Sequence, residues 1–270
     1  MEKLQAALAT ARKARSGEPV PSAEQVRTAA KRKRERSASG DIWNQLDTFE
    51  PPSSALKEHR VVSNTASNAA TPFDILRTKI VLQMRQNNWT RLGITSPMPN
   101  SGKSTIACNL ALGLGRQKEF RSMLFDLDLR DPSVAEFFAQ EPEVGLSSVL
   151  DGQEHFEDQA KRIGDNLIVS MADRPESDPA RIMLSERTVD TLDDIQRAYQ
   201  PDLMIFDLPS VLVNDDTRAF LKNVDCALIV SRANKTRYSQ FDICEREIAE
   251  HTNVLGVVLN AYRNADPVME

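Results

Sequence analysis

The sequence predicts an α/β protein, a three-layer sandwich in which helices cover both faces of a mainly parallel β-sheet. From about residue 73 onward, short apolar runs of strand length alternate with segments of helical periodicity. The apolar runs lack polar alternation, which is typical of strands buried on both faces. Hydrophobic residues make up 40% of the chain and charged residues 27%, as in globular proteins, and no run approaches the ~18–20 apolar residues that cross a bilayer.

The expected elements follow one another along the chain. An amphipathic helix begins at Phe73 and presents Leu76, Ile80, Val81 and Met84 on one stripe. The expected strands are residues 91–96, 122–128, 166–172, 202–208, 226–231 and 254–260. The expected helices between them are residues 104–118, 133–139, 181–199, 217–223 and 237–251.

The segments before this alternating region differ from it in composition. Residues 1–40 are rich in Lys and Arg, although the whole chain has a net charge of −5. We interpret them as a basic, solvated or partly disordered arm. The alternative is contact with anionic lipid headgroups or an acidic partner, whereas nucleic acid is disfavoured because no aromatic residue is interleaved with the charge. Residues 41–71 read as a linker that lies partly on the domain surface, and residues 72–270 form the main domain.

The cysteines and the N-terminus indicate a reducing compartment. Cys108, Cys226 and Cys244 are odd in number, far apart and free of metal-ligand spacing, so we expect buried reduced thiols. The three histidines are equally scattered and receive no role. The N-terminus lacks the pattern of an export signal, so we expect a cytoplasmic protein.

The stretch ITSPMPNSGKST, residues 94–105, joins an expected strand to an expected helix. Main-chain N–H groups at the start of a helix bind phosphate oxygens, and a following lysine neutralises phosphate charge. The usual pattern G-x-x-x-x-G-K-[ST] places a glycine where this chain has Pro97, and we expect Pro97 and Pro99 to hold the loop entry rigid instead. The expected phosphate-binding residues are Asn100, Ser101, Gly102, Lys103, Ser104 and Thr105.

Acidic residues follow two further expected strands. FDLDLR places Asp126 and Asp128 on one side of a strand end with Arg130 just beyond, and LMIFD delivers Asp207. Ligands in parallel sheets bind beyond the carboxyl ends of the strands, where carboxylates can face a metal or a phosphate. We expect Ser104, Asp128 and Asp207 to hold Mg²⁺, and Arg130 to contact phosphate. Solvated strand ends are the alternative interpretation.

These motifs together resemble those of the bacterial tyrosine kinases of capsule and exopolysaccharide export. ITSPMPNSGKST resembles their Walker A motif, LFDLDLRDP their Walker A′ motif and LMIFDLPS their Walker B motif; DPARIMLSE, VSRANKT and VLGVVLN also look like family landmarks. The resemblance covers residues 71–263 or so. It implies a P-loop NTPase fold with ATP and Mg²⁺ as cofactors.

The resemblance also implies an activity, partners and a location. The activity is transfer of the ATP γ-phosphate to tyrosine hydroxyls on a neighbouring copy, with Lys103, Asp126, Asp128 and Asp207 as catalytic residues. By family likeness, Asn260 is an adenine contact. The implied partners are further copies of the chain and the cytoplasmic tail of a membrane polysaccharide chain-length regulator, with recruitment to the inner membrane left open.

Three features depart from the family pattern. The family's terminal tyrosine cluster is missing, and the chain has only Tyr199, Tyr238 and Tyr262. Ser210 replaces the second proline of Walker B. The family's assembly helix, E-x-x-R-x-x-R, aligns with Thr71, Asp74 and Arg77, so its charges are mostly lost and we expect the subunit contact to be removed or rewired.

Two alternatives to an active kinase therefore stay open. The first is an ATP-dependent conformational switch or ATPase in polysaccharide export that does not phosphorylate tyrosine. The second is a positioning ATPase of the MinD/ParA type, which has a related sheet but whose signature lysine would fall at Met98.

Overall fold

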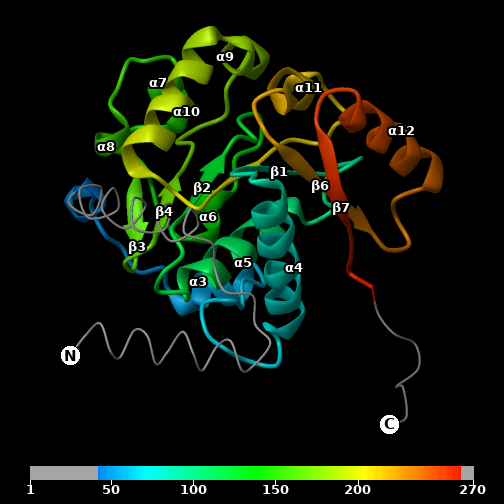
Figure 1. Cartoon of the computed structure of the whole chain (residues 1–270), viewed down its shortest axis with the longest axis horizontal. Helices are drawn as coiled ribbons and strands as arrows, with labels where there is room; N and C mark the ends of the chain where they lie inside the picture. Colours follow the sequence, from blue (N-terminus) through cyan, green and yellow to red (C-terminus); the bar gives the residue numbers. More distant parts are fainter. Residues whose placement is uncertain (1–41, 263–270) are drawn as a thin grey trace, which may run out of the picture. The chain divides into compact units, whose positions relative to one another are not determined.

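The computed structural model describes residues 42–262, so the basic arm at 1–40 lies outside the described residues. Within them the chain forms one seven-stranded sheet with the order β3-β4-β2-β5-β1-β6-β7 (Figure 1). Every neighbouring pair is parallel except β3 with β4. The strands are β1 Arg91–Thr95, β2 Ser122–Asp126, β3 Lys161–Ile163, β4 Leu167–Ser170, β5 Leu203–Asp207, β6 Cys226–Arg232 and β7 Asn253–Asn260.

Helices cover both faces of the sheet, which confirms the predicted three-layer α/β architecture. On one face, α4 and α5 pack over a core that includes Leu92, Ile94 and Leu228. On the other, aromatic rings stack between sheet and helices: Phe206 lies 5.1 Å from Phe125 of β2 and 5.1 Å from Phe220 of α11. The helices are α3 Ser53–Glu58, α4 Thr71–Asn87, α5 Lys103–Gly115, α6 Val134–Phe137, α7 Leu146–Leu150, α8 Phe156–Gln159, α9 Pro179–Leu184, α10 Glu186–Tyr199, α11 Asp216–Leu221 and α12 Tyr238–Ala249.

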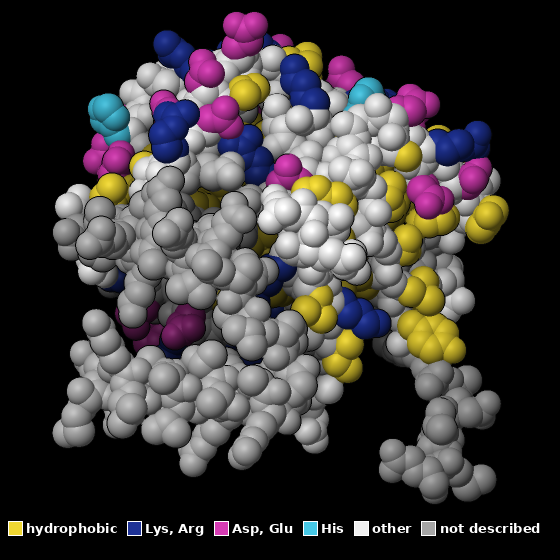
Figure 2. All heavy atoms as spheres, in the orientation of Figure 1, with side chains coloured by type: hydrophobic (Ala, Val, Ile, Leu, Met, Phe, Trp, Pro, Cys, Tyr) yellow, Lys and Arg dark blue, Asp and Glu magenta, His cyan; other side chains and the backbone are white. Residues whose placement is uncertain are grey.

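The six expected strands are present, because each is a run of apolar side chains that a covered sheet can bury on both faces. β2 and β5 are buried at every position. β7 is an edge strand and is only partly buried, with Val257 and Leu259 exposed. Figure 2 shows hydrophobic side chains along this side of the molecule, where α12 and β7 lie, and mixed charges over the face that carries α9 and α10.

One expected helix is wrong in its extent. The single helix predicted at 181–199 is two helices, α9 and α10, separated at Ser185. Ser185 has an extended backbone, and its hydroxyl accepts a hydrogen bond from the N–H of Arg187 at 3.2 Å. It therefore caps α10 and ends the helical run before it.

The segment that precedes α4 lies against the main body. The indole of Trp43 is 1% exposed and its Nε1 donates to the carbonyl of Tyr199 at 2.7 Å. Phe49 N donates to the carbonyl of Arg162 in β3 at 3.0 Å, and Leu56 and Val61 join the buried core. Trp43, Phe49, Leu56 and Val61 are thus points of contact between this segment and the domain.

Two further expectations concern the cysteines and membrane-spanning helices. The three cysteines are buried and free, as predicted. In the part of the chain that the structure describes, no helix combines the length and apolar character needed to span a membrane.

Candidate active site

The loop between β1 and α5 has the shape of an anion cradle. After Thr95 the chain turns through residues 96–102, and Asn100 and Gly102 adopt left-handed backbone angles, with φ of 58° and 88°. A side chain at Gly102 would be strained by this φ and would also place a Cβ 2.2 Å from Nδ2 of Asn260. Glycine avoids both the backbone strain and this close contact.

The main-chain N–H groups of residues 100–105 have no acceptor within the described chain. The first hydrogen bond that belongs to α5 runs from Ile106 N to Gly102 O at 3.0 Å. The preceding amides lie at the positive end of the α5 dipole, where an oxyanion can accept their hydrogen bonds. The loop therefore has free main-chain N–H groups at the residues where the sequence predicted phosphate contacts.

Hydroxyl groups hold the entry of this loop from the inside. Ser96 Oγ and Ser101 Oγ both donate to the carbonyl of Met98, at 2.8 and 2.7 Å. Ser96 Oγ also lies 3.0 Å from Oγ of Ser210, which follows β5. Ser210, where the family pattern has proline, thus links the Walker A-like and Walker B-like segments.

Two side chains hold the loop from the side of β6 and β7. Arg232 Nη1 donates to the carbonyl of Asn100 at 2.7 Å, and Asn260 Nδ2 donates to the carbonyl of Ser101 at 2.9 Å. Asn260 was expected as an adenine contact, and here its amide contacts the loop itself. Arg232 was not among the residues expected in the site; its signal in the sequence is its position at the carboxyl end of β6, which pairs with β1 in the sheet.

Lys103 makes a close ion pair in the cradle. Its Nζ lies 2.6 Å from Oδ2 of Asp128, and the two side chains are only 13% and 8% exposed. Burial opposes the charge of the ammonium group, but Asp207 and Asp128 outweigh this and raise the pKa of Lys103. Lys103 is therefore a permanent cation, held where a phosphate would arrive.

Asp126 and Asp207 are direct neighbours at the ends of adjacent parallel strands. They are paired in register between β2 and β5, and both side chains are fully buried. Oδ2 of Asp126 accepts the N–H groups of Ser133 and Val134 at the start of α6, at 3.2 and 3.0 Å. Asp126 thus combines a structural role with its place in the site.

The remaining carboxylate oxygens are unsatisfied. Oδ1 of Asp126 and both oxygens of Asp207 make no hydrogen bond of normal geometry among the described residues, although the Ser104 hydroxyl is near enough to Asp207 to lower its pKa. Burial, aided by the neighbouring Asp207, raises the pKa of Asp126 well above its ordinary value, and burial raises the pKa of Asp207 to about 6 despite the opposing charge of Lys103. Buried, unpaired carboxylates are costly unless a ligand completes them.

The acids fit a metal ion that is coordinated by phosphate oxygens as well as by the protein. Between residues 42 and 262, no group of three or more His, Cys, Asp or Glu side chains is arranged to hold a metal ion. The unpaired oxygens of Asp207 and the Ser104 hydroxyl at the start of α5 fit Mg²⁺, which takes few protein ligands and completes its shell with water and phosphate oxygens. Asp128, the third expected ligand, is paired with Lys103.

Arg130 lies in a two-point ion pair. Its Nε and Nη2 bond to Oδ2 and Oδ1 of Asp216 at 2.5 and 2.9 Å, and Asp216 is fully buried. The pair joins the segment after β2 to the start of α11. The guanidinium that the sequence assigned to phosphate is therefore fixed in place by a buried carboxylate.

The altered charges of α4 are used within the chain. Asp74 Oδ1 bonds to Arg77 Nη1 at 2.8 Å and also pairs with Arg116 just after α5. Arg77 Nη1 donates to the carbonyl of Gly113 at 2.8 Å. Asp74 thus ties α4 to the end of α5.

Comparison with known proteins gives relatives named as tyrosine kinases. No protein-family model matches the chain. It is 29% identical over 190 residues to the tyrosine-protein kinase YwqD of Bacillus subtilis, which covers 70% of this chain and 79% of YwqD. It is 25% identical over 202 residues to the tyrosine-protein kinase etk of Escherichia coli K12, and 27% identical over 189 residues to the putative tyrosine-protein kinase EpsB of Ralstonia nicotianae. These matches cover 74% and 69% of this chain, but only 27% of etk and 25% of EpsB.

Solved structures show the same fold. The kinase domain of Escherichia coli ETK has a TM-score of 0.69 at 22% identity, covering 78% of this chain and 83% of that one. The septum site-determining protein MinD of Pyrococcus horikoshii, complexed with Mg-ADP, has a TM-score of 0.54 at 18% identity, covering 66% and 72%.

The chain therefore has the fold of the P-loop NTPase structures. In sequence it is similar to bacterial tyrosine kinases, as its motifs predicted.

Proposed function

We propose that this chain binds ATP with Mg²⁺ and transfers the γ-phosphate to tyrosine hydroxyls. The observation that carries the proposal is the convergence of Lys103, the free amides of the loop and the unsatisfied oxygens of Asp126 and Asp207. Each is a group that a triphosphate and its cation would satisfy. The structure of a cobyrinic acid a,c-diamide synthase with ATP analog and magnesium, a TM-score 0.55 neighbour, supports this choice of ligands.

The residues divide the task by their chemistry. The loop amides and Lys103 bind and orient the phosphates, and Ser104 with Asp207 would hold Mg²⁺, which neutralises charge on the phosphates when bound. A buried carboxylate of raised pKa, Asp126, is suited to accept the tyrosine proton, with Asp128 as the second candidate. Arg130, held by Asp216, keeps the segment after β2 in place.

The proposed setting is the export of exopolysaccharide. We place the chain in the cytoplasm as a self-associating protein whose partner is the cytoplasmic tail of a membrane chain-length regulator, in keeping with the named relatives and the CapA2B2 chimeric structure, which covers 81% of this chain at a TM-score of 0.68. The basic arm would contact anionic lipid near that partner.

A second candidate is an ATP-dependent switch that does not phosphorylate tyrosine. The scarcity of acceptors favours it, because the chain has three tyrosines and Tyr199 is buried. A MinD/ParA-type positioning ATPase is less favoured, since the MinD structure matches with a TM-score of 0.54 against 0.69 for the ETK kinase domain.

The test is incubation of the full chain with γ-labelled ATP and Mg²⁺, alone and with a candidate regulator tail. We expect labelled phosphotyrosine in the wild type and none in Lys103→Met, with the exposed Lys222→Met as a matched control that keeps activity. ATP hydrolysis without any phosphotyrosine would exclude the kinase and leave the switch.

A further inference from the structure

The tyrosines of this chain differ sharply in accessibility. Tyr199 is 2% exposed, its ring meets Trp43 and Phe156 edge-on, and burial raises the pKa of its hydroxyl. Tyr262 is 63% exposed just beyond β7, and Tyr238 is 82% exposed at the first residue of α12. Only the last two can present a hydroxyl to another active site.

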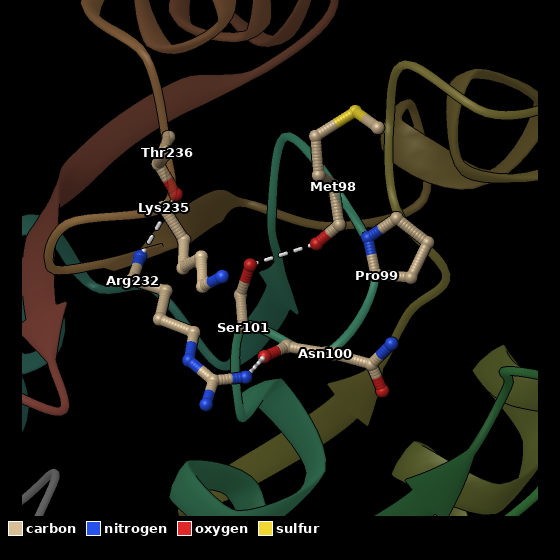
Figure 3. Close-up of a pocket in the computed structure, with 7 residues that line it drawn as sticks. All are labelled: Met98, Pro99, Asn100, Ser101, Arg232, Lys235 and Thr236. Carbon is tan, nitrogen blue, oxygen red and sulfur yellow. Dashed lines mark hydrogen bonds between the residues drawn. The ribbon is translucent and has the colours of Figure 1, made fainter.

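Tyr238 follows a turn that carries unpaired cations. Arg232 and Lys235 line a pocket of about 280 Å³ together with Met98, Pro99, Asn100, Ser101 and Thr236 (Figure 3). Lys235 extends toward the loop near Ser101 in this view. Among the ion pairs of residues 42–262, none involves Arg232, Lys235 or the adjoining Arg237. The pocket therefore offers positive charge with no acidic partner.

Two of these cations lie beside Tyr238 in the sequence. Lys235 and Arg237 precede it, and both side chains are exposed. Once phosphorylated, the tyrosine carries a charge of about −1.5 to −2 and three strong acceptor oxygens, which Arg and Lys side chains bind through charge-assisted hydrogen bonds.

We propose that Tyr238 is a phosphorylation site of this chain and that Lys235, three residues before it, binds the phosphate. The proposal rests on the proposed kinase function. Lys235 also lines the pocket that Asn100 and Ser101 border, so its side chain lies close to the loop between β1 and α5.

The transfer balances with ATP as the phosphoryl donor. Oη of Tyr238 forms a bond to the γ-phosphorus while the bond from that phosphorus to the β–γ bridging oxygen breaks, and ADP leaves with the electron pair. The phenolic proton passes to the carboxylate of Asp126, Asp128 or Asp207 and from there to solvent.

The first experiment maps the phosphate. The full-length wild type, Tyr238→Phe and the matched control Tyr262→Phe are incubated with ATP and Mg²⁺, with a synthetic Glu–Tyr copolymer as a separate substrate. We expect phosphate on Tyr238 in the wild type and in Tyr262→Phe, and loss of most of the chain-borne phosphate in Tyr238→Phe. The copolymer should be phosphorylated equally by all three, because an exposed Tyr238 is not needed for folding.

The outcomes separate the two proposals. Undiminished chain phosphorylation in Tyr238→Phe, or phosphate on Tyr262 with Tyr238 unmodified, overturns the Tyr238 site while copolymer labelling keeps the kinase proposal. Absence of phosphate from both chain and copolymer overturns both.

The second experiment tests Lys235. The phosphorylated wild type and Lys235→Ala are treated with a tyrosine phosphatase, with the exposed Lys222→Ala as control. We expect faster release of phosphate from Lys235→Ala only. Equal rates in all three overturn the role of Lys235.

Discussion

The two sides of the nucleotide loop are built on opposite principles. On the side of β2 and β5 stand Asp126 and Asp207, buried carboxylates with unsatisfied oxygens. On the side of β6 and β7, Arg232 and Asn260 donate to the carbonyls of Asn100 and Ser101. The first side therefore has polar groups that only a ligand would pair, whereas the second side fixes the conformation of the loop that would receive the ligand.

The largest effect is expected for Lys103→Met. The change removes the cation from a trio of buried acids and the phosphate contact at once, so we expect loss of phosphoryl transfer by about 10²-fold or more and clearly weaker nucleotide binding. Fluorescent-nucleotide titration and phosphotyrosine assays measure both effects. Normal nucleotide affinity in this variant would contradict the assignment of the loop.

The buried, unpaired carboxylate of Asp207 is expected to lower the stability of the nucleotide-free protein while serving its function. Its pKa in the folded chain, about 6, lies above the ordinary value of 3.8. Between these values the folded state binds more protons than the unfolded state, so the stabilisation present near pH 4 is lost as the pH rises through 6. Asp207→Asn should therefore stabilise the nucleotide-free protein by on the order of 2 kcal/mol at pH 7.5, with little gain near pH 4.

Urea unfolding at the two pH values measures this difference. The exposed Asp190→Asn serves as a control with no gain. The same Asp207→Asn protein should lose phosphoryl transfer. A variant that is destabilised at pH 7.5 would show that Asp207 has a partner in solution.

Gly102→Ala tests the side of the loop that Asn260 contacts. A φ of 88° and the close approach of Asn260 Nδ2 should together cost about 1–3 kcal/mol of folding free energy and weaken nucleotide binding. Asn260→Ala in the same chain removes the clash but not the backbone strain. In a double-mutant cycle, the double variant should lose less folding free energy than the two single variants lose together. Strict additivity would show that the two residues act independently.

The smallest effect is expected for Arg232→Ala. Loss of the hydrogen bond to Asn100 O removes about 0.5–1.5 kcal/mol of loop organisation, hence a several-fold rise in the dissociation constant for ATP. Calorimetric titration of the variant beside Arg237→Ala, whose exposed side chain does not reach the loop in any described hydrogen bond, measures it. An unchanged dissociation constant would show that the hydrogen bond from Asn260 alone keeps the loop in its conformation.

Much of the fold followed from local patterns. The six parallel strands are apolar on both faces, and the Gly-Lys-Ser loop and the acids lie at strand ends, where their spacing is short and regular. β3 was missed because Lys161 and Arg162 give its three residues no apolar run; its pairing depends on β4 and on a bridge between Arg162 and Thr48.

The partners within the site could not be read from the chain in the same way. Arg130 meets Asp216 across 86 positions, and Arg232 meets Asn100 across 132. Such contacts are set by how the sheet orders its strands, which no local spacing encodes. The sequence therefore predicted which groups gather at the strand ends, but not which of them pair with one another.

The burial of Trp43 determines where the folded body can be trimmed. The guanidinium carbon of Arg121 lies over its ring, 5.0 Å from the ring centroid, and its Nε1 donates to the carbonyl of Tyr199. Truncation of such a side chain costs about 3–5 kcal/mol, a large part of the stability of an ordinary domain. A recombinant fragment for crystallisation should accordingly start upstream of Trp43, because one started at residue 72 would leave open cavities where Trp43, Leu56 and Val61 now sit.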